Sequence, residues 1–151
     1  MEMPLSVVFQ NESFIVIDKP ALSLSVPSRQ GSADERPVVG LLLQEQLNKK
    51  IYPVNRLDFG VSGIILFALN ADAHRAANKW FEKQEVKKTY SALTEQKSAV
   101  NLKPFSMFRW ESLLVRGKKR VFEADHGQQS ITEALYVGEK HGNLEWELHP
   151  V

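Results

Sequence analysis

The last third of the chain constrains the fold most, because it contains two consecutive hairpin patterns. The runs "SMFRWESLLV" and "RVFEA" flank the basic stretch "RGKK", and the runs "ITEALYV" and "LEWELHP" flank "GEKHGN". Strand-length apolar runs joined by short polar turns are typical of hairpins. In the last run Leu144, Trp146 and Leu148 alternate with glutamates, which predicts a strand with one buried face. This part of the chain should therefore form an antiparallel sheet.

The N-terminal part of the chain predicts two strands, a loop and a helix. "LSVVFQNESFIVIDKP" reads as two short strands around a turn at residues 10–13, and Pro20 ends the second strand. The Ser- and Pro-rich residues 21–37 predict a loop. Pro37 suits the first position of a helix. "VVGLLLQEQLN" behind it carries apolar residues on a helical face, with Gly40 as its weak point.

The middle of the chain predicts a buried strand followed by an amphipathic helix. The continuous apolar run at residues 64–69 indicates a strand that is covered on both faces. Asn70 is placed to cap the helix that follows. In "ADAHRAANKWFEKQ" the apolar residues recur at the spacing of one helix face, and "KTYSALT" predicts another strand. The predicted apolar face of the helix consists of Ala73, Ala76, Ala77, Trp80 and Phe81.

These elements together indicate an α+β protein. Strands and helices are mixed without a regular strand–helix–strand alternation, so we expect a mixed, mostly antiparallel sheet with flanking helices. The 151 residues suit a single domain over 1–151. The formal net charge is +1, so any binding of nucleic acid would have to rely on local basic patches.

The composition excludes several classes of protein. The chain has no cysteine, which excludes disulfides, thiolate nucleophiles and cysteine-based zinc sites. The four histidines lack the spacing of a metal-ligand set, and there is no glycine-rich phosphate-binding motif. The N-terminus does not have the pattern of a signal peptide, and the longest apolar run is too short to span a bilayer. We therefore expect no metal, no membrane association and a cytoplasmic location.

The stretch "VNRLDFGVSG" places an acid, Asp58, just before the apolar run. On spacing alone the favoured interpretation is a loop aspartate that accepts backbone N–H groups or pairs with Arg56. The alternative is a carboxylate that acts as a nucleophile or base at the entrance of a strand. Gly60 and Gly63 would then let the backbone turn and a substrate approach, and Arg56 could reach a phosphate.

Tyr90 and several basic residues carry similar alternatives. Tyr90 is either a core aromatic of its strand or a surface on which a base stacks. The basic residues are either solvated charges or contacts to the backbone of a nucleic acid. They comprise Lys87 and Lys88, and the hairpin-tip residues Arg116, Lys118, Lys119 and Arg120.

Several stretches, taken in order, resemble the RluA-type pseudouridine synthases. "VVFQNESFIVIDKPALSLSVPS" is similar to the family's opening segment, "VNRLDFGVSGIILFA" to its signature H-R-L-D-x-x-T-S-G, and "KKTYSAL" to the K-x-Y segment that follows. "QQSITEALYV" and "LEWELHPV" resemble the approach to its last motif. Asn55 and Val61 stand where the signature usually has His and Thr.

The resemblance implies a role for individual residues and a reaction. Asp58 corresponds to the catalytic aspartate and Tyr90 to the tyrosine that stacks on the target base. Arg56 corresponds to the basic residue that holds a flipped-out nucleotide, with Asn55 and Leu57 beside it in the substrate-binding motif. Lys19 and Pro20 correspond to structural parts of the opening motif. The implied reaction converts uridine to pseudouridine in structured tRNA or rRNA and needs no cofactor. Its partner is RNA.

The resemblance also predicts where the chain departs from the family. The family continues with T-G-R-x-H-Q-x-R, which would supply an Arg facing the catalytic acid, whereas this chain ends at Val151. No S4-like RNA-binding domain is recognised before the first strand. The expected catalytic domain is therefore C-terminally incomplete. A second hypothesis is an inactive fragment that binds RNA or forms a homo-oligomer through an exposed sheet edge. A third is an unrelated α+β domain in which Asp58 is only a turn residue.

Overall fold

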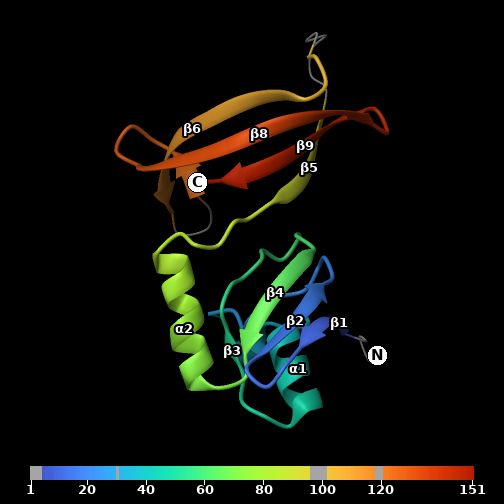
Figure 1. The fold of residues 1–151 in the computed structure, drawn as a ribbon, viewed down its shortest axis with the longest axis vertical. Helices are drawn as coiled ribbons and strands as arrows, with labels where there is room; N and C mark the ends of the chain where they lie inside the picture. The colour runs from blue at the N-terminus through green and yellow to red at the C-terminus, as the bar shows by residue number, and fades with distance from the viewer. Residues whose placement is uncertain (1–4, 30, 96–101, 118–120) are drawn as a thin grey trace. The chain divides into compact units, whose positions relative to one another are not determined.

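The computed structural model describes residues 5–29, 31–95, 102–117 and 121–151 of the chain. These residues form two compact units, Met1–Glu85 and Val86–Val151 (Figure 1). All named strand pairs are antiparallel, and they divide between two sheets. The prediction of an α+β protein with antiparallel strands is therefore confirmed, although the strands form two sheets instead of one. In the described ranges, no helix is long and apolar enough to cross a membrane.

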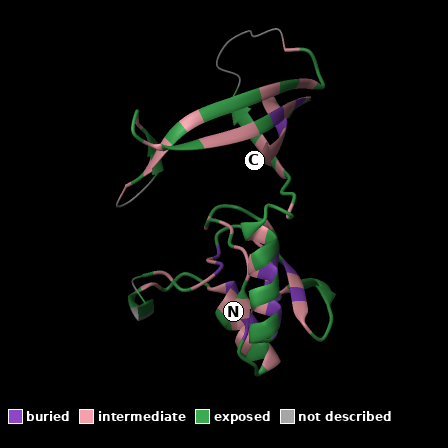
Figure 2. Ribbon diagram, turned by 60° about the vertical axis from the view of Figure 1, so that its left-hand side comes forward, coloured by how far each residue is buried: buried purple, intermediate pink, exposed green. Residues whose placement is uncertain are grey.

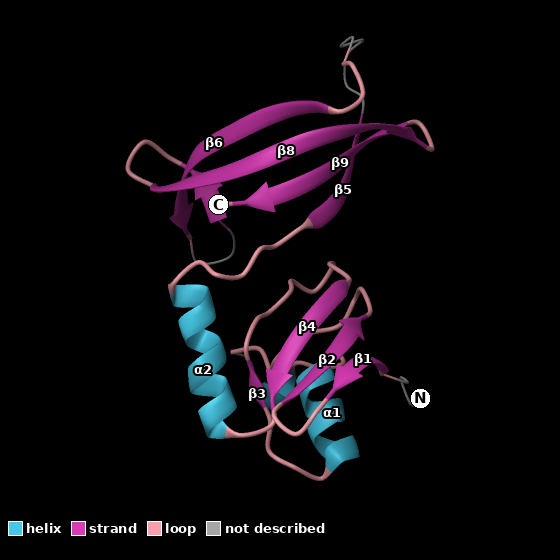
Figure 3. Ribbon diagram, viewed as in Figure 1, coloured by secondary structure: helices cyan, strands magenta, loops and turns pink. Residues whose placement is uncertain are grey.

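The first unit combines a four-stranded sheet with two α-helices (Figure 3). The sheet has the order β1-β2-β4-β3. The predicted strand pair at the N-terminus is confirmed, since Asn11 closes the turn by accepting the amides of Ser13 and Phe14 through its side chain. The elements of the unit are β1 (Ser6–Gln10), β2 (Phe14–Lys19), a 3-10 turn (Gly31–Ala33), α1 (Val39–Leu47), β3 (Tyr52–Pro53), β4 (Gly63–Ala68) and α2 (Ala71–Glu82).

The core of the first unit lies between the central strands β2 and β4 and helix α1. Alternate residues of each strand are buried, as the period of two along a strand requires (Figure 2). On the other face of β4 the exposure falls along the strand, from 53% at Ile64 to none at Ala68. The prediction that this strand is covered on both faces is therefore wrong at its first residues. The core consists of Ile15, Ile17, Val39, Leu43, Ile51, Ile65, Phe67 and Leu69.

Helix α1 begins two residues later than the sequence predicted. Val38 is its N-cap residue and has an extended backbone, and Val39 is the first helical residue. The reason is that the carbonyl of Pro37 accepts the amide of Leu24 at 2.8 Å, and Val38 pairs with Leu24 in an isolated parallel bridge. The connection between β2 and α1 thus holds these residues extended until Val39.

Helix α2 confirms the predicted cap. The Oδ1 atom of Asn70 accepts the amide of Ala73 at 2.8 Å, which satisfies one of the free donors of the first turn. The predicted apolar face is only partly buried. Ala73 and Ala77 are buried, whereas Trp80 is 38% exposed and lies against Phe14 with a ring-centroid distance of 5.4 Å.

The second unit is a five-stranded sheet of order β5-β9-β8-β6-β7. Both predicted hairpins are present, formed by β6 with β7 and by β8 with β9. The alternation in the last strand is also confirmed, since Trp146 is buried and Leu144 and Leu148 pack beside it. The strands are β5 (Tyr90–Glu95), β6 (Ser106–Arg116), β7 (Val121–Glu123), β8 (Gln128–Lys140) and β9 (Asn143–Pro150).

An aromatic cluster centred on Trp146 forms the core of the second unit. The ring of Trp146 lies 5.7 Å from that of Phe108, 5.0 Å from Trp110 and 5.3 Å from Tyr136, measured between centroids. Its indole N–H donates to the hydroxyl of Thr94 at 2.9 Å, so the polar atom of this buried ring has a partner.

Candidate functional site

Asp58 lies in the loop of residues 54–62 that joins β3 to β4, called the Asp58 loop below. The loop starts as a continuation of the β3–β4 pairing. The amide of Val54 donates to the carbonyl of Leu66 at 2.9 Å. The side chain of Asn55 makes the next two hydrogen bonds to β4. Its Oδ1 accepts the amide of Leu66 at 2.8 Å, and its Nδ2 donates to the carbonyl of Ile64 at 3.2 Å. Asn55 therefore fastens the start of the loop to β4.

Ser25, in the connection between β2 and α1, holds the residue that precedes Asp58. Its hydroxyl donates to the carbonyl of Leu57 at 2.7 Å and accepts the amide of Leu57 at 3.0 Å. Ser25 is 4% exposed, so both hydrogen bonds are shielded from water. The carbonyl of Ser25 in turn accepts the amide of Gly40 at 3.2 Å, which ties this contact to the first turn of α1.

Arg36, in the same connection, contacts the residue that follows Asp58. Its guanidinium carbon lies 4.9 Å from the centroid of the Phe59 ring, a cation–π geometry. The guanidinium is oriented by Asp34 through a bidentate pair, with Nε–Oδ1 at 2.8 Å and Nη2–Oδ2 at 2.6 Å. Hydrogen bonds from Arg36, and then from Ser28, hold the pKa of the Asp34 carboxyl well below its usual range.

The side chain of Asp58 is exposed between these two anchored neighbours. Leu57 and Phe59 are half-buried, whereas Arg56, Asp58 and Gly60 are exposed. The carbonyl of Asp58 accepts the amide of Val61 at 3.1 Å, so the residue opens a turn. Within the described part of the chain its carboxylate makes no hydrogen bond and no ion pair, including none with Arg56. Its carboxylate is therefore not used to support the loop.

Lys19 is a buried charge that interacts electrostatically with Asp58 of this loop. It is fully buried at the end of β2, and its Nζ donates to the carbonyls of Pro20 at 3.0 Å and Ser23 at 2.9 Å. Burial lowers the pKa of the Lys19 ammonium from its ordinary value, and the negative charge of Asp58 acts in the opposite direction. The structure thus places a buried cation within electrostatic reach of the exposed carboxylate.

The other predicted site residues belong to the second unit. Tyr90 is the first residue of β5, is half-buried and pairs in register with Leu148, on the face of the sheet that carries Trp146. Lys87 and Lys88 are exposed just before β5, and Arg116 is exposed at the end of β6. The remaining hairpin-tip residues, Lys118, Lys119 and Arg120, lie outside the described residues.

Three contact residues of the Asp58 loop were not singled out from the sequence. Ser25 and Arg36 lie in a Ser- and Pro-rich stretch without periodicity, and Phe59 directly follows the acid in the loop. Ser25 contacts a residue 32 positions away. A side chain-to-backbone contact over that separation leaves no pattern in a single sequence, so only the structure reveals it.

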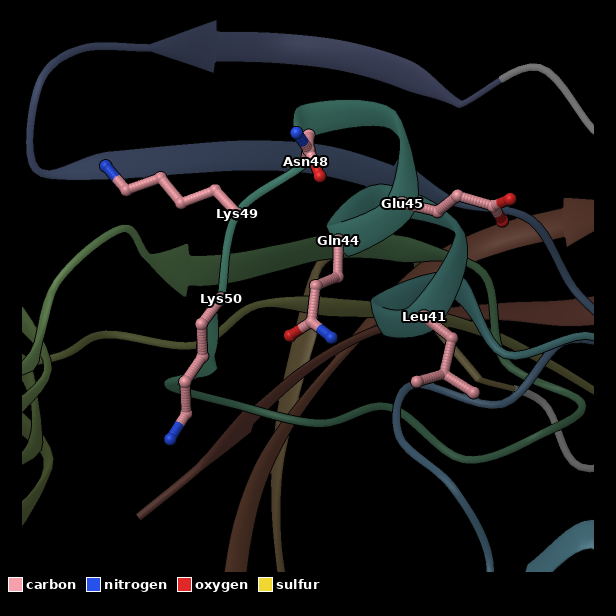
Figure 4. Close-up of a pocket in the computed structure, with 6 residues that line it drawn as sticks. All are labelled: Leu41, Gln44, Glu45, Asn48, Lys49 and Lys50. Carbon is pink, nitrogen blue, oxygen red and sulfur yellow. The ribbon is translucent and has the colours of Figure 1, made fainter.

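A pocket in the first unit lies at the C-terminal end of α1, and none of the residues that line it belongs to the Asp58 loop (Figure 4). The side chains of Lys49 and Lys50 extend from it in different directions, so they do not converge on one point for an anion. The residues that line it are Leu41, Gln44, Glu45, Asn48, Lys49 and Lys50.

Comparison with known proteins agrees with the order of motifs in the sequence. A family model described as RNA pseudouridylate synthase matches residues 13–146. The chain is 35% identical over 91 residues to tRNA pseudouridine synthase C of Haemophilus ducreyi, covering 60% of this chain and 37% of that protein. It is 36% identical over 107 residues to the dual-specificity RNA pseudouridine synthase RluA of Pasteurella multocida, covering 65% and 46%. The matched region thus spans less than half of either relative.

A solved structure gives the same fold. The human RNA pseudouridylate synthase domain containing 1 superposes with a TM-score of 0.75 at 20% identity, covering 99% of this chain and 62% of that one. At this identity the likeness establishes the fold alone. The family model, in contrast, matches most of the sequence. The chain therefore belongs to the RNA pseudouridylate synthase family and is a member of the RluA type.

Proposed function

We propose that this chain carries the aspartate-bearing part of an enzyme that isomerises uridine to pseudouridine in structured RNA, with Asp58 as its catalytic residue. The observation that supports the proposal is the state of the Asp58 carboxylate. It is exposed and unpaired within the described residues, although both of its neighbours are anchored. A carboxylate that supported the loop would accept hydrogen bonds from it, as Asp34 does from Arg36.

The reaction needs only groups that a chain of this kind can supply. The N1–C1′ bond of uridine breaks, the uracil turns, and a C5–C1′ bond forms. The proton on C5 is lost and one is gained at N1, so no atom or electron is exchanged overall. The carboxylate of Asp58 would attack C1′ or C6, or remove the proton from C2′. In each case the target base must leave its stack to reach the acid.

The remaining site residues take different parts in this proposal. We assign contact with the flipped nucleotide to Arg56, which is exposed beside the acid, and stacking on the base to Tyr90. Asn55 and Leu57 make their hydrogen bonds to protein groups, so their contribution to substrate binding would come through the shape of the loop. RNA backbone contacts would fall to the exposed Lys87 and Lys88 and to the basic hairpin around Arg116.

Both units are part of this proposal. The family model extends from residue 13 to residue 146 and so includes β2 of the first unit and the first half of β9 of the second. We therefore propose that the two units are parts of one catalytic domain.

The proposed substrate is tRNA or rRNA. The reaction would take place in the cytoplasm.

The experiment is to incubate the purified chain with unmodified tRNA and rRNA transcripts and to map pseudouridine by mass spectrometry. Wild type should form pseudouridine, and Asp58→Asn should form none, because an amide cannot act as a nucleophile or base. The matched control is Asp72→Asn, which removes an exposed aspartate of α2 that pairs with Arg75. Equal activity of wild type and Asp58→Asn would show that Asp58 is not catalytic. No pseudouridine with either RNA class would refute the proposed reaction for this chain.

A second candidate function is binding without catalysis. It is favoured by the short match, which spans 37% of tRNA pseudouridine synthase C and 46% of the RluA relative. A chain of this kind would retain affinity for tRNA in a filter-binding assay but leave its uridines unchanged. Pseudouridine formation by the same preparation would rule it out.

Self-association through a sheet edge belongs to this second candidate. All residues of the edge strand β1 are exposed, including the apolar Val7, Val8 and Phe9. Pairing of β1 with the same strand of a second copy would satisfy its free backbone groups. Light scattering at increasing protein concentration should then show a dimer that Val8→Lys disrupts. A monomer at all concentrations would refute it.

A further inference from the structure

The connection between β2 and α1 contacts the Asp58 loop immediately before and immediately after the acid. Before it, the Ser25 hydroxyl makes two hydrogen bonds to the backbone of Leu57. After it, the Arg36 guanidinium lies over the ring of Phe59. The two residues held in this way, Leu57 and Phe59, are half-buried, and Asp58 between them is exposed. The arrangement holds the flanks of the loop toward the body of the unit and leaves the carboxylate of Asp58 facing solvent.

Ser25 and Arg36 are themselves held in place by other residues of the first unit. The carbonyl of Ser25 accepts the amide of Gly40, and the neighbouring Leu24 exchanges backbone hydrogen bonds with Pro37 and Val39 at 2.8 Å each. Ser25 is therefore attached to the start of α1. Arg36 is held by the bidentate pair with Asp34, whose side chain is only 6% exposed. A guanidinium held at two nitrogens by one carboxylate has little freedom to leave the ring it covers.

We propose that Ser25 and Arg36 are positioning residues that fix the Asp58 loop from both sides and so preorganise its carboxylate for reaction with the target uridine. The catalytic half of this inference rests on the proposed function. The physical reason is that the rate of an attack depends steeply on geometry. A displacement of the reacting group by about 1 Å can lower the rate about 100-fold.

A competing explanation is that Arg36 contacts RNA directly. Its side chain is 44% exposed, and arginine is a common ligand of phosphate. The two roles differ in kinetics. Loss of a positioning contact lowers kcat and leaves KM unchanged, whereas loss of a phosphate contact raises KM and reduces the dependence of binding on salt.

The first measurement is amide hydrogen exchange, which needs no activity. The amide of Val61 donates to the carbonyl of Asp58, and in the part of the chain that the structure describes it makes no hydrogen bond to Ser25 or Arg36, so its exchange reports on the order of the turn. Ser25→Ala and Arg36→Gln should each raise its exchange rate by about tenfold. Ser25→Thr retains the hydroxyl and should restore protection. Unchanged exchange at Val61 in both variants would overturn the proposal, whether or not the chain is active.

Two control variants match the tested residues. Arg75→Gln breaks an exposed Arg–Asp pair on α2, and Arg75 contacts no aromatic ring in the described part of the chain. Ser23→Ala removes a buried hydroxyl of the same connection that donates to the carbonyl of Pro20 at 2.6 Å. Neither variant should change the exchange rate at Val61. A rise at Val61 in the controls equal to that in the tested variants would show general destabilisation and refute a specific hold on the loop.

The second measurement is pseudouridine formation under steady-state conditions. Ser25→Ala and Arg36→Gln should lower kcat by about tenfold or more and leave KM within about twofold. A raised KM with unchanged kcat would overturn positioning in favour of RNA contact. If wild type forms no pseudouridine, the proposed function fails, and the exchange rates at Val61 still decide whether the two residues fix the loop.

Discussion

Replacement of Gly40 by alanine should destabilise the first unit, although alanine favours a helix. Gly40 lies in the first turn of α1, where its amide donates to the carbonyl of Ser25 at 3.2 Å. A Cβ atom built on Gly40 lies 2.9 Å from that carbonyl oxygen and 3.3 Å from Cε1 of Phe67. The oxygen is a backbone atom and Phe67 is a buried core ring, so neither neighbour can move aside alone.

The magnitude follows from two opposing effects. Alanine in place of glycine stabilises a helix by about 1 kcal/mol. Overpacking of a tight contact costs about 1–3 kcal/mol, and loss of the hydrogen bond to Ser25 costs about 1 kcal/mol more if α1 shifts outward. The unfavourable contributions exceed the gain in helix propensity, so we expect Gly40→Ala to lower the free energy of unfolding by about 1–3 kcal/mol. For a chain of this length that lowers Tm by about 2–12 °C.

The assay is urea and thermal unfolding followed by far-UV circular dichroism. The matched control is Gly60→Ala, because a Cβ at Gly60 meets no atom within 4 Å. That variant should be neutral or more stable by about 0.4–1 kcal/mol, since alanine restricts the unfolded chain. If Gly40→Ala proves as stable as wild type or more stable, the reasoning from close approach is wrong and helix propensity dominates at this site.

Three further predictions test separate features. Leu22 has a left-handed backbone with φ of 60° and a side chain that is 66% exposed, so Leu22→Gly should raise the free energy of unfolding by about 1 kcal/mol, and an unchanged melting curve would contradict this. Asn70→Ala removes the cap on the amide of Ala73 and should cost about 1 kcal/mol in urea unfolding, whereas a midpoint equal to that of wild type would show that the cap contributes nothing. The pKa of Asp34 is lowered in the folded protein, so its pairing with Arg36 should contribute stability at neutral pH. The stability difference between wild type and Asp34→Asn should therefore hold down to pH about 4 and shrink only below it, and a difference that disappears above pH 5 would refute the pairing.

Local features of the fold could be predicted from the sequence because each depends on neighbouring residues. The two hairpins of the second unit follow from alternation and turn residues, and the cap by Asn70 follows from its place before an amphipathic run. The start of α1 was misplaced at Pro37 because a bridge to Leu24 keeps the backbone extended there. That bridge joins residues that are distant in sequence, and helix propensity does not report it.

The same distinction applies to the candidate site. The sequence placed Asp58 in a loop before a strand, and the structure agrees. It did not show what holds that loop, because the contacts of Ser25 and Arg36 join the loop to a segment without periodicity. Gly40 is a second example. From helix propensity alone a glycine at this position weakens the helix, whereas the structure shows that the missing side chain allows the close approach of Ser25.

All the contacts described for the Asp58 loop come from residues that precede β5. Lys19, Ser25 and Arg36 precede the loop, and the last partner strand, β4, ends at Ala68. Proteins fold as they are synthesised, from the N-terminus onward. The surroundings of the acid can therefore be assembled on the ribosome while the second unit is still being translated. A ribosome stalled after the first unit has emerged should already display a loop in which Asp58 is held in place.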